Sequence, residues 1–259
     1  MSRRFALIVA ALLTTTSLVL AACQTAPAAP LLTDPKEILT ETVVSLKDLK
    51  TVEFTGSFTG TVEAAELGGN LDLSTVKLSG ALDVPNKKAR FSLDAPSLLG
   101  TNIEALLVGE EAYYKVEGML AGMLGATAGK YTKTEVPESS GEPMTDPAEI
   151  AKAVDEVRAA LDKLPNPPTK GADEKCGDQD CYHVTITATA DQLQGLDPTG
   201  GAASGDVKFD LWTRHSDRLP AKLSVSVDSP EVGTVGMTFD FRYGVNVSVD
   251  APPADQIAP

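Results

Sequence analysis

The stretch Val235-Gly-Met-Thr-Phe-Asp-Phe-Arg-Tyr243 determines the fold class of this chain, because apolar side chains occupy every second position along it. Successive side chains of a strand point to opposite faces of a sheet, so this segment has one apolar face. The same alternation occurs at 182–188, 207–213 and 221–227, with Thr, Ser, Lys, Asp and Arg on the opposite faces. These four segments predict antiparallel strands with one buried face and one face in water.

Further strands are predicted before these four. Residues 52–62 alternate in the same way, and strand-like runs follow at 70–84, 88–95, 101–108, 111–116 and 130–136. About ten antiparallel strands result, and a sheet of that size curls strongly. Gly56 and Gly60 in the first long strand suit such bending.

Two helices are predicted, each introduced by an Asp-Pro pair. Asp34-Pro35 begins a helix over 35–49, and Asp146-Pro147 begins a second one that ends at the proline cluster 165–168. The repeated opening indicates either an internal duplication or a common way to start a helix, and we favour the second. The predicted fold class is α+β: a strongly curved antiparallel half-barrel whose helices cover its concave face.

The N-terminus has the features of an export signal. Arg3 and Arg4 precede an apolar run over 5–20, which Leu20-Ala-Ala-Cys23 closes. This predicts a secretory signal at 1–22. The cysteine after Leu-Ala-Ala resembles the lipobox of bacterial lipoproteins, which implies an acylated Cys23 followed by an Ala/Pro-rich tether over 23–33. An ordinary signal peptide, or a single-pass anchor with a chance cysteine, is the alternative.

Composition restricts the partners of the remaining chain. Residues 34–259 are long enough for one large domain, and a hydrophobic content of 42% excludes a disordered chain. The formal charge of the full chain is −14, and cleavage of the signal would remove two arginines and make the remaining chain more negative. Such a surface repels nucleic acid and anionic headgroups, so we expect no nucleic-acid partner and attribute membrane attachment to the lipid. A second apolar run of about 18 residues does not occur, so no further spanning helix is predicted.

Besides Cys23, the chain has only Cys176 and Cys181, in Cys-Gly-Asp-Gln-Asp-Cys before a strand-like run. A disulfide closing a hairpin, a metal clip and two free thiols are the three possibilities. A lone pair is a poor zinc signal and lacks the spacing of a redox motif. An extracytoplasmic location favours a structural disulfide.

The order of these elements resembles that of a known family. The chain resembles the LppX/LprAFG lipoproteins in the order lipobox, tether, capped helix, long meander, second helix and four strands. The runs Asp34-Pro-Lys-Glu-Ile-Leu-Thr-Glu-Thr and Val207-Lys-Phe-Asp-Leu-Trp-Thr-Arg add to this resemblance. These are related in fold to the lipoprotein carrier and receptor of the Lol system. The resemblance implies a half-open β-barrel closed by helices around an apolar cavity for acyl chains of lipids or glycolipids. An envelope exporter is a further candidate partner.

The apolar stripes of the helices and strands line the cavity if the chain is a carrier, and are ordinary core if it is not. The candidates for the cavity wall are Ile38, Leu39, Val43, Leu46, Phe54, Phe58, Val154, Val157, Leu161, Phe209, Leu211, Leu223, Val225, Met237 and Phe239.

The glycine-rich apolar stretch 118–129 is a candidate for a mobile lid, or for a lip that enters the membrane to accept lipid. Its large side chains are Met119, Leu120, Met123 and Leu124, and methionine adapts to varied binding surfaces. A buried loop or short helix that fills the core is the alternative. Trp212 lies on the polar face of its predicted strand, where we expect it to pack against a neighbouring element rather than to stack on a ligand.

Catalysis has little support in the sequence. His183 and His215 are the two histidines, and we find no nucleophile elbow, His-Glu-x-x-His motif, phosphate loop or paired metal-binding aspartates. We therefore expect a non-enzyme with no metal and no cofactor. The leading prediction is an extracytoplasmic, membrane-anchored lipoprotein that binds lipids or lipidated molecules for transport across the envelope. The alternative is a cavity-free module that senses or tethers a protein partner at the cell surface.

Overall fold

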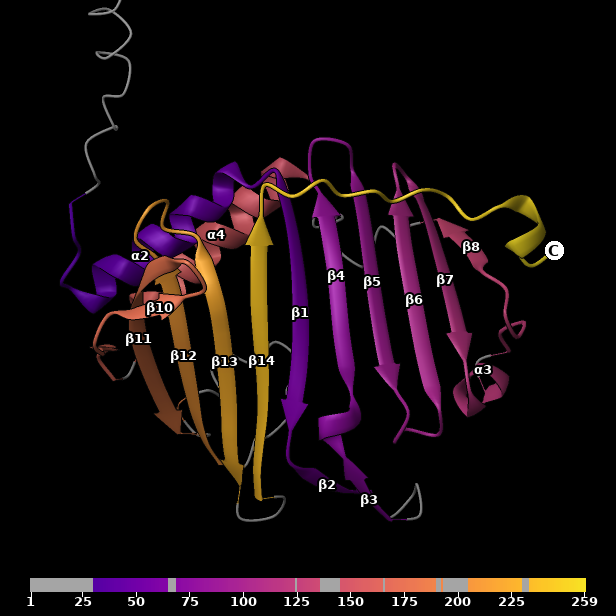
Figure 1. Cartoon of the computed structure of the whole chain (residues 1–259), viewed down its shortest axis with the longest axis horizontal. Helices are drawn as coiled ribbons and strands as arrows, with labels where there is room; N and C mark the ends of the chain where they lie inside the picture. Colours follow the sequence, from indigo (N-terminus) through magenta and orange to yellow (C-terminus); the bar gives the residue numbers. More distant parts are fainter. Residues whose placement is uncertain are drawn as a thin grey trace, which may run out of the picture. The chain divides into compact units, whose positions relative to one another are not determined.

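A single antiparallel sheet of twelve strands is the framework of the computed structural model (Figure 1). The structure describes residues 30–64, 69–123, 125–135, 145–164, 166–189, 192, 205–229 and 233–259. The predicted signal 1–22, Cys23 and most of the tether lie outside these residues. Residues Leu32–Pro259 form one compact unit, to which the following description applies.

The sheet joins the two halves of the chain through its first strand. Its order is β10-β11-β12-β13-β14-β1-β4-β5-β6-β7-β8, and β9 pairs with β11. A separate two-stranded sheet contains β2 and β3. The strands are β1 (Thr51–Thr59), β2 (Thr61–Ala64), β3 (Gly69–Asp72), β4 (Lys77–Asp83), β5 (Lys88–Ala95), β6 (Thr101–Val108), β7 (Glu111–Glu117), β8 (Thr132–Glu135), β9 (Thr169–Lys170), β10 (Glu174–Cys176), β11 (Gln179–Thr189), β12 (Asp206–Arg214), β13 (Pro220–Ser229) and β14 (Gly233–Tyr243).

Compared with the sequence prediction, the fold class is confirmed and some boundaries change. The predicted strand over 52–62 ends at Thr59, because Gly60 has a positive φ of 103° and the chain turns there into β2. The predicted strand over 70–84 is divided into β3 and β4 by a 3₁₀ turn, η4 (Leu73–Thr75). Asp72 caps this turn by accepting a hydrogen bond from the backbone of Ser74.

Both long helices begin where the Asp-Pro pairs predict. Helix α2 (Pro35–Ser45) is capped by Asp34, whose side chain accepts hydrogen bonds from the backbone N–H groups of Lys36 and Glu37. A 3₁₀ turn, η2 (Leu46–Asp48), extends it. Helix α4 (Pro147–Leu161) is capped in the same way by Asp146. Figure 1 shows α2 and α4 beside the half of the sheet that contains β11 to β1, while β4 to β8 extend beyond them.

The C-terminal segment was not predicted and covers part of the opposite face of the sheet. After β14 the chain runs along the ends of β4 to β7 toward β8 (Figure 1, yellow). Val249 is buried there with Leu106, Tyr113 and Tyr131. The backbone of Tyr131 donates to Gln256 O (2.8 Å) and accepts from Ala258 N (2.8 Å), which fixes the end of the chain to the sheet.

Candidate functional site

The sheet has one apolar face, which continues from strand to strand in register. From β11 to β14, Val184 lies opposite Leu211, Leu211 opposite Leu223, and Leu223 opposite Phe239. In β1, Phe54 lies between Phe241 of β14 and Gly80 of β4. Beyond them, the same face continues through Phe91 of β5, Ala105 of β6 and Tyr114 of β7.

Helix α2 covers this face at the β11 end. Ile38 and Leu39 form a buried cluster with Tyr182 and Val184 of β11, and Leu161 of α4 packs against the cluster. Two polar contacts accompany the apolar packing. The hydroxyl groups of Thr42 and Thr213 lie 2.7 Å apart, and the Tyr182 hydroxyl group accepts hydrogen bonds from Leu32 N and from the Arg218 side chain. The hydroxyl groups of Thr42, Thr213 and Tyr182 are therefore paired, as burial requires.

Away from α2, large apolar side chains of this face remain partly in contact with solvent. Phe91 is 38% exposed and Tyr114 is 37% exposed. An aromatic row along β1 and β14 is half-buried: the ring centroids are 6.2 Å apart for Phe54 and Phe239, and 6.2 Å for Phe239 and Phe241. The row ends at Tyr243, whose centroid lies 6.3 Å from that of Phe241. Burial raises the pKa of the Tyr243 phenol above its usual value.

A glycine lets one of these rings lie close against the sheet. A Cβ atom at Gly80 would stand 2.2 Å from Cζ and 2.4 Å from Cε1 of Phe54, so the ring occupies the place of a side chain on the neighbouring strand. At Gly56, a Cβ atom would lie 3.1 Å from the Phe239 ring. Because the rings pack closely over glycines, their side chains extend less far from the backbone of the sheet.

The predicted cavity residues lie partly on the sheet and partly on the helices, and they differ in burial. Phe54, Phe58, Phe209, Leu211, Leu223, Val225, Met237 and Phe239 share the apolar face and are half-buried. On the helices, Ile38, Leu39 and Val154 are buried, Val43, Leu46 and Leu161 are half-buried, and Val157 is 48% exposed. Their role as a lipid-contacting wall stays a prediction.

The sequence prediction missed the apolar residues of β4 to β7, including Leu78, Phe91, Leu93, Ile103 and Tyr114. Their alternation in the sequence is present but is obscured by apolar residues on the other face, such as Leu106 and Val108. The second set is buried by the C-terminal segment, which cannot be inferred from a local pattern.

Two hollows lie beside the sheet, and neither contains any of the predicted cavity residues. One, of about 470 Å³, lies between the end of α2 and the end of β14, and includes Val44, Leu49 and Tyr243. The other, of about 700 Å³, includes the turn between β10 and β11 together with Trp212 and Lys222.

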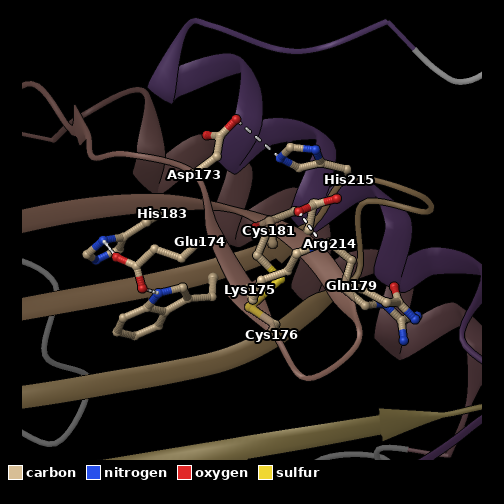
Figure 2. The surroundings of a disulfide bond; sticks show 12 residues. Asp173, Glu174, Lys175, Cys176, Gln179, Cys181, His183, Arg214 and His215 are labelled. Carbon is tan, nitrogen blue, oxygen red and sulfur yellow. Dashed lines mark hydrogen bonds and ion pairs between the residues drawn. A yellow bond between two sulfur atoms is a disulfide. The ribbon is translucent and has the colours of Figure 1, made fainter.

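The predicted disulfide is present and closes the turn between β10 and β11 (Figure 2). The Cα atoms of Cys176 and Cys181 are 6.0 Å apart, and Cys181 is fully buried. Just before the disulfide, the Glu174 carboxylate accepts a hydrogen bond from Trp212 Nε1 (3.0 Å) and lies 3.1 Å from His183 Nδ1. The disulfide thus fixes the short strand that carries Glu174.

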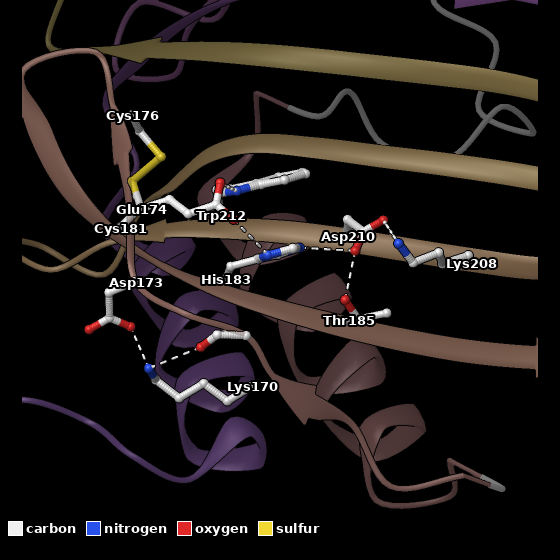
Figure 3. A network of polar contacts seen from close by, with 11 residues as sticks. Lys170, Asp173, Glu174, Cys176, Cys181, His183, Thr185, Lys208, Asp210 and Trp212 are labelled. Atoms are coloured by element: carbon white, nitrogen blue, oxygen red, sulfur yellow. Dashed lines mark hydrogen bonds and ion pairs between the residues drawn. A yellow bond between two sulfur atoms is a disulfide. The ribbon is translucent and has the colours of Figure 1, made fainter.

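The polar face beside the disulfide carries a network of polar contacts around His183 and Asp210 (Figure 3). The other nitrogen of His183, Nε2, lies 2.9 Å from an Asp210 oxygen, and Trp212 stacks on the imidazole ring with centroids 4.4 Å apart. Burial alone would raise the pKa of the Asp210 carboxyl group. Hydrogen bonds from Lys208, Thr185 and His183 together outweigh this effect, so the pKa lies below its usual value. Trp212 packs against a neighbouring strand, as predicted.

The stretch 118–129 contains a short helix, α3 (Met119–Met123), at the end of β7. Met119 is 61% exposed and Met123 is 75% exposed, whereas Leu120 is half-buried and Ala121 is buried. Leu124 lies outside the described residues. The large side chains of α3 are therefore divided between solvent and the body of the protein.

Neither a metal centre nor a membrane-spanning helix is seen in the part of the chain that the structure describes. Over those residues, His, Cys, Asp and Glu side chains do not come together in threes with the geometry of a metal site. Within the same ranges, each helix is too short or too polar to cross a bilayer.

Comparison with known proteins rests on structure, since no family model and no curated protein sequence matches the chain. Among solved structures, the lipoprotein LppX of Mycobacterium tuberculosis is 13% identical, with a TM-score of 0.50 over 83% of this chain and 98% of that one. LprF from Mycobacterium bovis is 15% identical, with a TM-score of 0.48 over 84% and 96%. At 13% identity, the similarity to LppX establishes the fold alone. The chain has the LppX-type fold that its sequence resemblance predicted.

Proposed function

We propose that this protein is a membrane-anchored lipoprotein of the cell envelope that binds acyl chains on the apolar face of its sheet. Its ligand is a lipid, a glycolipid or a lipidated molecule, which it carries across the envelope as a binding protein and not as an enzyme. Acylated Cys23 holds it to the membrane, and residues 23–33 serve as the tether.

The observation that supports this proposal most strongly is the partial exposure of the apolar face. Covering it would stabilise the protein, because each Å² of apolar surface removed from water contributes about 25 cal/mol. A sixteen-carbon acyl chain gains from the same contact, since leaving water is worth about 0.8 kcal/mol per methylene, or about 13 kcal/mol for the whole chain. Transfer from bilayer to protein is apolar to apolar, so uptake and release can both occur.

The test is whether the domain takes up lipid through this face. Residues 32–259 form a compact unit, so the domain can be produced without the N-terminal segment. Extraction and mass spectrometry should find reproducible lipid, and the emptied protein should bind a fluorescent fatty acid. A protein without lipid that also rejects the probe would favour the alternative function, a surface module for a protein partner.

A pair of matched variants locates the binding. Phe91→Asp places a carboxylate on the apolar face, where covering it with an acyl chain costs several kcal/mol, so binding of the probe should weaken by at least about tenfold. Ser57→Asp adds the same charge to the opposite face, across from Lys77, and should leave binding unchanged. Equal effects of the two substitutions would contradict binding on this face.

The anchor is tested separately. Cys23→Ala removes the thiol that would be acylated, so the protein should leave the membrane fraction during cell fractionation. Retention of the variant in the membrane would contradict a lipid anchor at Cys23, while leaving the lipid-binding test untouched.

A further inference from the structure

One end of the sheet carries no charged residue over two segments that lie against each other. These segments are 95–103, around the β5–β6 turn, and 118–129, which follows β7. Both lack Asp, Glu, Lys, Arg and His, although 22% of the whole chain is charged and its formal charge is −14. We call the described residues of these two segments, 95–103, 118–123 and 125–129, the neutral end.

The two segments are in direct backbone contact. The N–H group of Met119 donates to Leu99 O (3.3 Å), and a Cβ atom at Gly118 would stand only 2.4 Å from Gly100 O. Gly118 has a φ of 84°, so glycine is suited to this position both by its conformation and by the close approach. The close contact turns the chain sharply out of β7 and into α3.

The largest side chains that the neutral end presents to water are apolar, although the smaller Thr127 is exposed as well. Met119 and Met123 are among the most exposed large apolar residues of the described chain, at 61% and 75%. Ala121 is buried between them, at 5% exposed, and its carbonyl accepts a hydrogen bond from Ala126 N (2.9 Å). Helix α3 is thus fixed to the body of the protein while its methionines point outward.

We propose that the neutral end is a membrane-docking surface, with Met119 and Met123 entering the uncharged acyl region of a bilayer. This inference rests on the proposed function, because it says where a lipid passes between the bilayer and the apolar face. An acidic protein is repelled by phosphate-bearing headgroups wherever it presents carboxylates. The neutral end avoids this repulsion and offers flexible apolar side chains.

The place of the neutral end in the fold favours a bilayer over a protein partner. Ile103 and Val116 pair across β6 and β7 on the apolar face, and Val116 lies two residues before Gly118. The neutral end therefore adjoins the apolar face, so an acyl chain that leaves the bilayer at α3 has a short path to that face.

The experiment measures the depth of a probe on the full-length chain. Met123→Cys is labelled with an environment-sensitive fluorophore, and the protein is reconstituted into vesicles of phosphatidylcholine brominated in its acyl chains. The expected result is a blue shift and quenching of the label at position 123. The matched control is Ala153→Cys, an exposed apolar position on α4 outside the candidate lipid-contacting residues, whose label should stay in water and unquenched.

A second substitution tests the mechanism. Adding Met119→Asp to the labelled Met123→Cys protein should abolish the quenching, because a carboxylate opposes insertion of α3. An unquenched label at 123, or equal quenching at 123 and 153, would overturn the proposal and leave a protein partner for this surface. If lipid still co-purifies with the domain in that case, the proposed function stands and only the docking surface is wrong.

Discussion

Replacing Gly80 with alanine tests whether the apolar face depends on the Phe54 ring lying over a glycine. The new Cβ atom would start 2.2 Å from Cζ of Phe54, whereas carbon atoms in contact are about 3.5 Å apart. The ring must therefore move by about 1.3 Å. Gly80 and Phe54 are paired on the apolar face, so the ring moves outward into the space where we place the acyl chain.

The expected change in stability follows from two opposing effects. Overpacking of this kind costs about 1–3 kcal/mol, and replacing a strand glycine by alanine returns about 0.5–1 kcal/mol through reduced backbone entropy of the unfolded chain. The free energy of unfolding should fall by about 0.5–2 kcal/mol in urea titrations. Binding of the fluorescent fatty acid should weaken in the same variant.

Two controls separate this mechanism from a general effect of alanine. Gly122→Ala places a Cβ atom in open space in α3 and should keep or slightly raise stability. Phe54→Leu combined with Gly80→Ala removes the clash, so the two substitutions together should cost less than the sum of their separate effects. A Gly80→Ala protein with undiminished stability and undiminished probe binding would refute the argument.

Three further predictions concern the disulfide, the first helix and the polar network. Cys176→Ser with Cys181→Ser opens a short loop and should lower the free energy of unfolding by about 2 kcal/mol in urea titrations, and an unchanged value would show that the link adds no stability. Asp34→Ala removes the cap of α2 and should cost about 1 kcal/mol by thermal unfolding, with Asp34→Asn retaining most of it. The pKa of Asp210 is lowered in the folded protein, so the stability that its carboxylate contributes is complete above its unfolded pKa of about 3.9 and is lost as the pH falls through the folded value. Asp210→Asn should therefore flatten the acid side of a curve of unfolding free energy against pH. An unaltered curve would contradict this.

Much of the fold could be predicted from local patterns. Alternation along 207–213 and 235–243 corresponds to β12 and β14, and the Asp-Pro pairs at Asp34 and Asp146 begin α2 and α4. The disulfide was predicted from the spacing of two cysteines and an expected oxidising location. These features depend on residues close in sequence, where steric and hydrogen-bond preferences act without knowledge of the rest of the chain.

The extent of the candidate site could be predicted only in part. The residues from β11 to β14 and β1 were recognised because the other face of those strands is polar. Those of β4 to β7 were missed because Val249 and the C-terminal segment bury Leu106 and Tyr113 on the other face. Burial by a distant segment makes both faces of a strand apolar and removes the alternation on which the prediction depends.

The sequence by itself determined most of the long strands, the helix starts, the formal charge and the uncharged segments around Leu99 and Met119. Only the tertiary structure decided that β1 joins the two halves of the sheet, that Phe54 lies over Gly80, and that α2 covers one end of the apolar face and not all of it. The physical reason is the separation in sequence of the interacting residues, because propensity, capping and alternation act over only a few residues. Strand order, ring packing and the extent of helix coverage depend on contacts between residues far apart in the chain.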